Sequence, residues 1–359
     1  MAQPIGYDNV RFWGDYNDPA AVEELLAHRS AAIRKRLQVG KGSRIRYLAL
    51  SGGGQYGAFS AGILTAWSDK GTRPQFDGVT GISTGAIIAP FAFLGADYDD
   101  VLEEIYTTLT TEDVAQRRVL AGLLRGSALS DTKPLQDRIA SYVTPEFLKR
   151  IAAERAKGRL LLVGTTNLDV GRPVIWDMGA IAASGRPDAL ELFRKVILAS
   201  AAIPIAFPPV RFTVEANGRR YEELHVDGGV TSQVSVLSPQ IPLGQLDARV
   251  GRSFKRDLYV IVNGAVTPLP EAVKPTVPGI GAASVNTLWY AQATGDLYKI
   301  FATAQRDRVN TRYAWIPDTF AAEPDEQFDP VFMRKLFDLG QSLVRQNTVW
   351  NRYPPNFTP

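Results

Sequence analysis

The chain has 359 residues, of which 45% are hydrophobic and 21% charged, a composition typical of a globular protein with a large buried core. Forty Lys and Arg residues against 37 Asp and Glu residues leave a net charge of +3, which is too balanced to indicate a nucleic-acid partner. The chain contains no cysteine, which excludes disulfides and thiolate metal sites, and its two histidines, His28 and His225, argue against a histidine-built metal site. We therefore expect neither a metal nor another cofactor.

The apolar stretches of the chain do not predict a membrane span. Residues 85–96 are too few to cross a bilayer, and residues 196–210 are interrupted by three prolines. The N-terminus shows no basic start followed by an apolar run, the pattern typical of a signal peptide. We expect a cytoplasmic protein if this N-terminus is native, and an exported or membrane-associated protein if a leader has been removed.

The first elements along the chain are an arm and a helix. Residues 1–18 alternate between polar and aromatic side chains, which predicts an arm lying on the body of the protein. Asp18 followed by Pro19 is a typical helix start, because a capping side chain precedes a proline at the first helical position. His28 lies in this helix and is interpreted as a surface or boundary residue. We assign the arm and the helix to residues 1–43.

A strand followed by a glycine-rich turn opens the main domain. Apolar residues at 45 and 47–50 predict a buried strand, and Gly52, Gly53 and Gly54 end it. Without a Cβ, these glycines allow a sharp turn and let backbone N–H groups approach a ligand closely. Helical spacing of apolar residues begins at Gln55.

The next strand leads into a candidate nucleophile. Residues 76–80 predict a strand, and the five residues after it read Gly81-Ile82-Ser83-Thr84-Gly85. This is the G-x-S-x-G pattern between a strand and a helix, which is the context of a nucleophile elbow. We take Ser83 as the nucleophile. The apolar residues 86–94 predict a central, buried helix.

The rest of the chain alternates between strand and helix patterns. Residues 99–157 show several short helical patterns and no convincing strand, which favours a cap or lid; the apolar run 119–124 is either a lipid-facing surface or a core helix. Further strands are predicted at 159–165, 173–176, 221–226, 257–262 and 313–316, with an extended segment beginning at 207–210, and further helices at 189–200, 281–307 and 329–350. This alternation predicts an α/β fold with a mainly parallel sheet covered on both faces. We place one domain at 44–263 and a helical extension, packed on the same domain, at 264–359.

Serine needs a base, and the sequence favours a carboxylate over a histidine. In a Ser–acid–His triad of α/β-hydrolase order the histidine comes last, yet no histidine follows His225, and the intervening acids Asp169 and Asp177 lack a supporting motif. Asp227 ends a predicted strand and is followed by two glycines, which leave room beside it. A carboxylate there would act as general base toward Ser83.

Two further roles follow from these positions. The backbone N–H groups of Gly52, Gly53 and Gly54 would bind the oxyanion, aided by the N-terminus of the next helix. His225 lies two residues before Asp227, on the same strand face. It is either a group that tunes the dyad or, in the simpler interpretation, a structural histidine.

Three segments, in this order, resemble the signatures of patatin-like phospholipases. They are Gly52-Gly53-Gly54-Gln55-Tyr56-Gly57, Gly81-Ile82-Ser83-Thr84-Gly85 and Asp227-Gly228-Gly229. Residues 199–204 together with 207–210 are similar to a further family segment, and the resemblance covers about 44–263. It implies a Ser83–Asp227 dyad with the oxyanion hole at 52–54, on a three-layer α/β/α sandwich that cleaves acyl esters of lipids. Tyr56 stands where the family commonly has a basic residue, so a charge contact from that position is not carried over.

The glycine run also fits a second motif. Residues 52–57 also satisfy the dinucleotide fingerprint G-x-G-x-x-G, but that fingerprint requires an acid at the end of the second strand, where the serine turn lies.

The favoured function is a lipid acyl hydrolase of the phospholipase A or esterase type. The alternative is a catalytically weak lipid-binding or interaction protein that retains the fold. The expected partner is a lipid or ester substrate, and helix 281–307, with Trp289, Tyr290 and Tyr298, serves either peripheral membrane or acyl-chain contact or domain packing.

Overall fold

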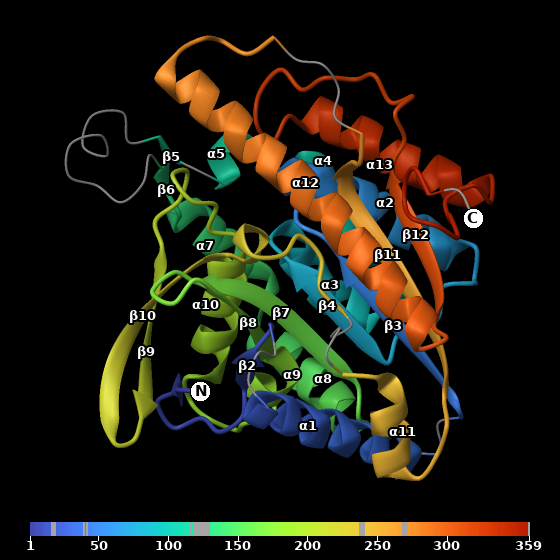
Figure 1. The fold of residues 1–359 in the computed structure, drawn as a ribbon. Coiled ribbons are helices and arrows are strands. Elements are labelled where there is room, and N and C mark those ends of the chain that lie inside the picture. The colour runs from blue at the N-terminus through green and yellow to red at the C-terminus, as the bar shows by residue number, and fades with distance from the viewer. Residues whose placement is uncertain are drawn as a thin grey trace.

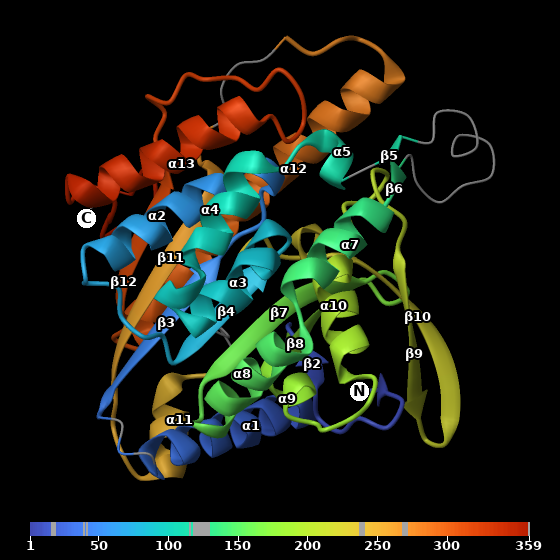
Figure 2. The same ribbon diagram turned by 180° about the vertical axis from the view of Figure 1, so that it is seen from behind.

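The computed structural model describes residues 1–15, 19–38, 40, 42–114, 116–117, 130–236, 241–267 and 272–357. In this part of the chain a ten-stranded sheet is covered by helices on both faces (Figures 1 and 2). The predicted three-layer α/β/α sandwich is thereby confirmed.

Five strands form the parallel centre of the sheet, as the strand–helix alternation predicts. They lie in the order β7 (Leu160–Asn167), β4 (Gly78–Ile82), β3 (Arg44–Leu50), β11 (Lys255–Ala265) and β12 (Asn310–Ile316). Every residue of β7 is buried, which requires cover on both faces of the sheet.

The remaining strands of this sheet extend it with antiparallel pairing. They are β10 (Arg219–Asp227), β9 (Val210–Ala216), β1 (Gln3–Pro4), β8 (Arg172–Asp177) and β2 (Arg11–Trp13). Because β1 and β2 come from the N-terminal arm, that arm is partly integrated into the sheet. The following helix, α1 (Pro19–Gln38), begins at the predicted proline, while Asp18 lies outside the described residues.

Two apolar cores fill the space between the sheet and its helices. One core is lined by the helices in front in Figure 2, namely α2 (Gly57–Asp69), α3 (Thr84–Leu94), α4 (Asp99–Thr108), α7 (Lys133–Tyr142), α8 (Pro145–Ala156), α9 (Met178–Ala182), α10 (Ala189–Ser200) and α13 (Pro330–Arg345). The other core lies under α1, α11 (Leu243–Val250) and α12 (Val277–Arg306), which are in front in Figure 1. Nine of the eleven residues of α3 are buried, so the prediction of a central buried helix is confirmed.

The segment 99–157, predicted as a cap or lid, contributes buried side chains to the first core. Leu102, Leu135 and Ile151 from α4, α7 and α8 belong to that core. The segment also contains the short helix α5 (Thr111–Val114) and a pair of two-residue strands, β5 (Gln116–Arg117) and β6 (Ser130–Asp131), which the sequence did not predict. The apolar run 119–124 lies outside the described residues.

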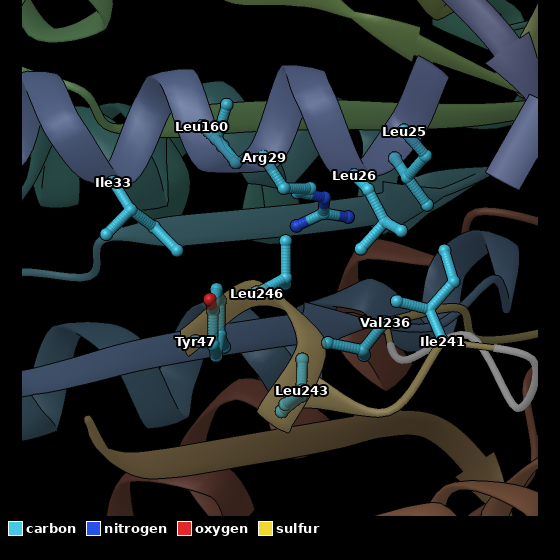
Figure 3. A pocket seen from close by; sticks show the side chains of 10 residues that line it. All are labelled: Leu25, Leu26, Arg29, Ile33, Tyr47, Leu160, Val236, Ile241, Leu243 and Leu246. Atoms are coloured by element: carbon cyan, nitrogen blue, oxygen red, sulfur yellow. The ribbon is translucent and has the colours of Figure 1, made fainter. Parts of the chain in front are cut away.

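An apolar cavity lies between α1, α11, the middle of β3 and the beginning of β7 (Figure 3). Its lining includes Leu26, Ile33, Tyr47, Leu160 and Leu246. Tyr47 pairs with Gly78, the first residue of β4, and Gly78 pairs with Leu160, the first residue of β7. The cavity therefore lies toward the amino ends of the parallel strands, away from the carboxyl ends that carry the predicted site. It contains none of the predicted site residues.

Candidate active site

The register of β7 brings the ends of two other strands together. Gly164 of β7 faces Ile82 of β4, and the next residue, Thr165, faces Asp227 of β10. Since β8 occupies the other edge of β7 along the same residues, β4 and β10 meet end to end on one side of β7. Ser83 directly follows Ile82 and therefore lies beside Asp227.

Ser83 occupies a strained turn between β4 and α3. Its backbone has φ 54° and ψ −123°, a conformation that costs a non-glycine residue about 1–3 kcal/mol. The Ser83 N–H donates to the hydroxyl of Ser200 (3.0 Å), and that hydroxyl donates to the carbonyl oxygen of Gly164 (2.7 Å). This anchoring holds the sharp strand-to-helix turn that a nucleophile elbow requires.

The motif glycines are required by close contacts rather than by flexibility. A Cβ added to Gly81, Gly85 or Gly228 would lie within 2.1–2.5 Å of a backbone oxygen. A Cβ on Gly57 or Gly229 would lie 2.4 or 2.8 Å from a side-chain atom. No side chain fits at the first three positions without moving the backbone, so these glycines allow β3, β4 and the turn after β10 to converge.

Asp227 is a buried carboxylate with an elevated pKa. It is 4% exposed, and burial raises its pKa to about 7, against the opposing effects of the Ser83 hydroxyl and the Gly229 N–H. The Gly229 N–H donates to Oδ1 (2.7 Å). Oδ2 accepts no hydrogen bond of standard geometry from the described residues. A carboxylate with this pKa is suited to accept a proton near neutral pH.

The glycine loop borders the serine, and one of its three predicted donors is already engaged. A Cβ on Gly52 would lie 3.2 Å from the Cβ of Ser83. The Gly52 N–H donates to the carbonyl of Gln233 (3.1 Å), whereas the N–H groups of Gly53 and Gly54 donate to no group in the described ranges. Gly53 and Gly54 are therefore the candidate oxyanion donors, and Gly52 supports the loop.

Asn263, at the carboxyl end of β11, holds this loop in place. Its N–H donates to the Ser51 hydroxyl (2.8 Å), its side-chain amide donates to the Ser51 carbonyl (2.9 Å), and its Oδ1 accepts from Ser60 (2.6 Å). A Cβ on Gly53 would lie 2.0 Å from the Asn263 carbonyl oxygen. Asn263 was not predicted from the sequence, and Ser200 was singled out only as part of the family-like segment 199–204, without a role. The one signal for Asn263 was a polar residue at the end of an apolar strand, where parallel sheets place their sites.

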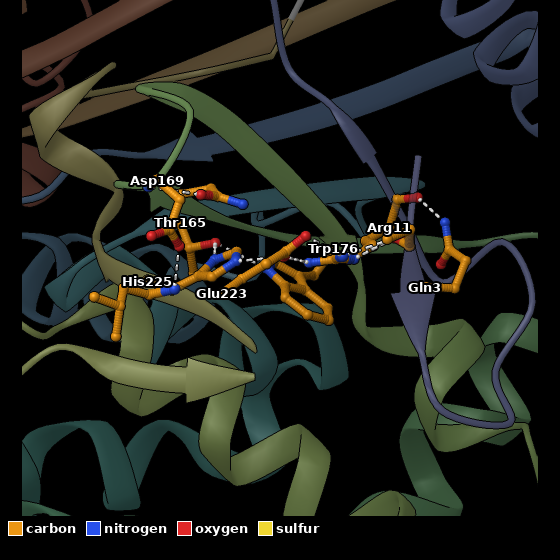
Figure 4. A network of polar contacts seen from close by, with 10 residues as sticks. Gln3, Arg11, Thr165, Asp169, Trp176, Glu223 and His225 are labelled. Carbon is orange, nitrogen blue, oxygen red and sulfur yellow. Dashed lines mark hydrogen bonds and ion pairs between the residues drawn. The ribbon is translucent and has the colours of Figure 1, made fainter. Parts of the chain in front are cut away.

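His225 belongs to a buried network that is separate from the dyad (Figure 4). Because the ionised Glu223 carboxylate can only accept, Nε2 of His225 carries the proton and donates to it (3.2 Å). In the neutral ring Nδ1 then accepts from the Thr165 hydroxyl (2.8 Å), and that hydroxyl itself accepts from the indole N–H of Trp176 (2.8 Å). Burial lowers the pKa of His225 despite the nearby Glu223 carboxylate. These contacts favour the structural interpretation of His225.

The Glu223 carboxylate connects this network to the N-terminal arm. Arg11, which is fully buried, donates to Glu223 (2.6 Å) and lies over the ring of Trp176. Burial acts to raise the pKa of Glu223, but the hydrogen bonds from His225 and Arg11 outweigh it and lower the pKa to about 2. The Arg11–Glu223 ion pair therefore holds the N-terminal arm against β10, the strand that ends in Asp227.

The other titratable candidates lie away from Ser83. Nε2 of His28 is 2.6 Å from a carboxylate oxygen of Asp177, which is fully buried and also pairs with Arg155. Asp169 accepts from the N–H of Leu224 (2.7 Å) and supports a turn. Neither acid is connected to the serine in the described structure, which agrees with the preference for Asp227 as base.

Comparisons with known proteins give one family and several solved structures. The family model described as patatin-like phospholipase matches residues 48–238, just over half of the 359 residues. Solved structures similar to this chain include VipD from Legionella pneumophila, at 14% identity and a TM-score of 0.41, with 85% of this chain and 67% of VipD covered. Human GIVD cytosolic phospholipase A2 is 11% identical with a TM-score of 0.31, with 81% of this chain and 57% of that one covered. A comparison with curated proteins found no match.

Proposed function

Because this chain belongs to the patatin-like phospholipase family, we propose that it hydrolyses acyl ester bonds of lipids through Ser83 and Asp227. The main support is that a strained serine, a buried carboxylate and a glycine loop converge at one edge of β7. The alternative, a catalytically weak lipid-binding protein, would not require a carboxylate with a raised pKa beside a strained serine.

In the proposed mechanism, Asp227 transfers one proton in each of two half-reactions. Asp227 takes the proton of the Ser83 hydroxyl as Oγ attacks the ester carbonyl, and the N–H groups of Gly53 and Gly54 stabilise the oxyanion. The intermediate expels the alcohol, which receives that proton, and leaves an acyl group on Ser83. Asp227 then takes a proton from water as it attacks the acyl group, and returns it to Ser83 as the fatty acid leaves. The sum is an ester and water converted to an acid and an alcohol.

We also propose that the first half of α12 contacts the lipid surface. Its outward face carries Val277, Ile280, Ser284, Leu288 and Ala291, all exposed and spaced three or four residues apart. No charged residue occurs between Lys274 and Asp296, whereas a solvent-facing helix surface normally carries charges. This uncharged outward face of α12 is defined here as the α12 lipid face.

The α12 lipid face lies near the catalytic turn. The side-chain amide of Gln292 donates to the carbonyl of Val230 (3.5 Å), three residues after Asp227. No helix in the described ranges is long and apolar enough to cross a bilayer, so the contact we propose is peripheral.

Turnover of a short p-nitrophenyl ester and of a phospholipid, in wild type and Ser83→Ala, tests the hydrolase proposal. A fluorophosphonate should label wild type once, and mass spectrometry should locate the adduct on Ser83. Absence of turnover and of labelling in the folded protein would favour the lipid-binding alternative.

For the membrane contact, Leu288→Asp should reduce sedimentation with phosphatidylcholine vesicles and turnover of vesicle lipid, without changing turnover of the soluble ester. Ala302→Asp is the matched control, because Ala302 is exposed on the same helix beyond the uncharged segment. Equal losses in both variants would contradict the assignment of the α12 lipid face.

A further inference from the structure

Asp296 is a buried carboxylate that none of the catalytic steps uses. It lies on α12, outside the family-matched segment, and is 4% exposed. Its Oδ2 accepts hydrogen bonds from the Ser232 hydroxyl (2.9 Å), the Gln233 N–H (2.7 Å) and the Val234 N–H (3.4 Å). All three donors belong to the short segment 232–234, which follows the catalytic turn.

Gln233, the central residue of that segment, connects the two halves of the candidate active site. Its carbonyl accepts from the N–H of Gly52 in the glycine loop (3.1 Å). Its side-chain amide donates to the carbonyl of Gly229 (3.0 Å), and the N–H of Gly229 donates to Asp227 (2.7 Å). A displacement of Gln233 therefore moves the oxyanion loop and the base together.

We propose that Asp296 is a positioning residue for the reaction, acting through Gln233 to fix the glycine loop relative to Asp227. This inference rests on the proposed hydrolase function. A single oxygen that accepts from three donors of one segment defines where that segment lies. Misplacement of reacting groups by about 1 Å can reduce turnover on the order of 100-fold.

Anchoring of α12 alone does not account for this carboxylate. Leu297 and Ile300, on the same helix, are already buried in the second core. Burial of a charged group costs free energy unless hydrogen bonds compensate for it, and the cation facing Oδ1, Lys299 at 3.3 Å, is half exposed. The compensation comes from the segment 232–234, and the carboxylate in turn orders that segment.

Three variants separate positioning from general packing. Asp296→Ala removes the shared acceptor, and we expect kcat for a short soluble ester to fall about 10- to 100-fold with KM nearly unchanged. Asp296→Asn can keep an oxygen at the Oδ2 position, and it should restore most of the rate. Lys299→Met removes the ion pair and leaves the loop bonds, so its kcat should match wild type.

A pH profile supplies a readout that packing alone would not move. The Gly229 N–H lowers the pKa of Asp227, so a displaced turn should shift the acidic limb of kcat/KM to higher pH in Asp296→Ala. Hydrogen exchange supplies a readout independent of catalysis. Peptides covering residues 52–57 and 228–234 should exchange faster in Asp296→Ala and not in Lys299→Met.

The outcomes distinguish this inference from the hydrolase proposal. A wild type without ester turnover would contradict the hydrolase proposal, and hydrogen exchange would still report whether Asp296 orders both loops. The inference would be overturned if wild type is active and Asp296→Ala has the same kcat, the same acidic limb of kcat/KM and the same hydrogen exchange in both loops. If Asp296→Ala does not fold, Ser232→Ala removes one of the three bonds, and unchanged exchange at 52–57 and 228–234 in that variant would likewise overturn it.

Discussion

Replacing Asp227 with Asn should abolish turnover and, at alkaline pH, stabilise the fold. The carboxylate is buried and burial raises its pKa from 3.8 to about 7. The native state therefore binds this proton more tightly than the unfolded chain. The associated stability is fully present below the unfolded pKa of 3.8, decreases as pH rises, and is lost above about pH 7.

The size of the effect follows from the pKa difference. Each pKa unit corresponds to about 1.36 kcal/mol of unfolding free energy, so a pKa difference of about 3 corresponds to roughly 4 kcal/mol. An asparagine at this position is neutral at every pH and does not carry that cost. The difference in unfolding free energy between Asp227→Asn and wild type should therefore grow in favour of the variant as pH rises. The total is about 4 kcal/mol between pH 3.8 and pH 7, of which about 3 kcal/mol falls above pH 5.

The assay is urea denaturation of both proteins at about pH 5 and about pH 9, with ester turnover measured in parallel. Wild-type kcat/KM should rise with pH through about 7, because the base must be ionised. Asp227→Asn should lack activity, since an amide cannot accept the serine proton. Parallel pH–stability curves for the two proteins, or an active asparagine variant, would refute the assignment of a buried base.

Three further predictions concern the elbow, the histidine and the oxyanion loop. The unfolding free energy of Ser83→Gly, measured by urea denaturation, should exceed that of Ser83→Ala by about 1 kcal/mol. Glycine relieves the strain of the positive φ, and the greater conformational entropy of its unfolded chain offsets part of that gain. His225→Ala should lower the unfolding free energy by about 2–4 kcal/mol and keep kcat per folded molecule within a few-fold; a loss as large as that of Asp227→Asn would restore a histidine mechanism. Gly53→Ala should reduce soluble-ester turnover on the order of 10²- to 10³-fold, whereas Tyr56→Phe should stay within a few-fold. A thermal melt of each variant checks its folding. Equally mild losses of ester turnover in Gly53→Ala and Tyr56→Phe would place the oxyanion hole elsewhere.

Local sequence determined which elements form and which residues carry the chemistry. The strand patterns, the glycine run and the G-x-S-x-G turn are encoded by neighbours in the chain, because hydrophobic period and glycine placement act over a few residues. Helix α10 has the predicted bounds, Ala189–Ser200. Element ends were less predictable, since they depend on tertiary contacts: α13 ends at Arg345, five residues before the predicted end, and α12 begins at Val277, four residues before the predicted start.

Tertiary structure alone decided how the candidate site is assembled. The register that sets Asp227 beside Ser83 depends on β7, whose sequence shows no sign of a catalytic role. The hydrogen bond from the Gly52 N–H to Gln233 joins residues 181 positions apart. The hydrogen bond from Gln233 to the Asp296 carboxylate joins residues 63 positions apart. Hydrogen bonds over such separations leave no periodic pattern in a single sequence, because each requires only one polar residue that the folded chain brings into contact.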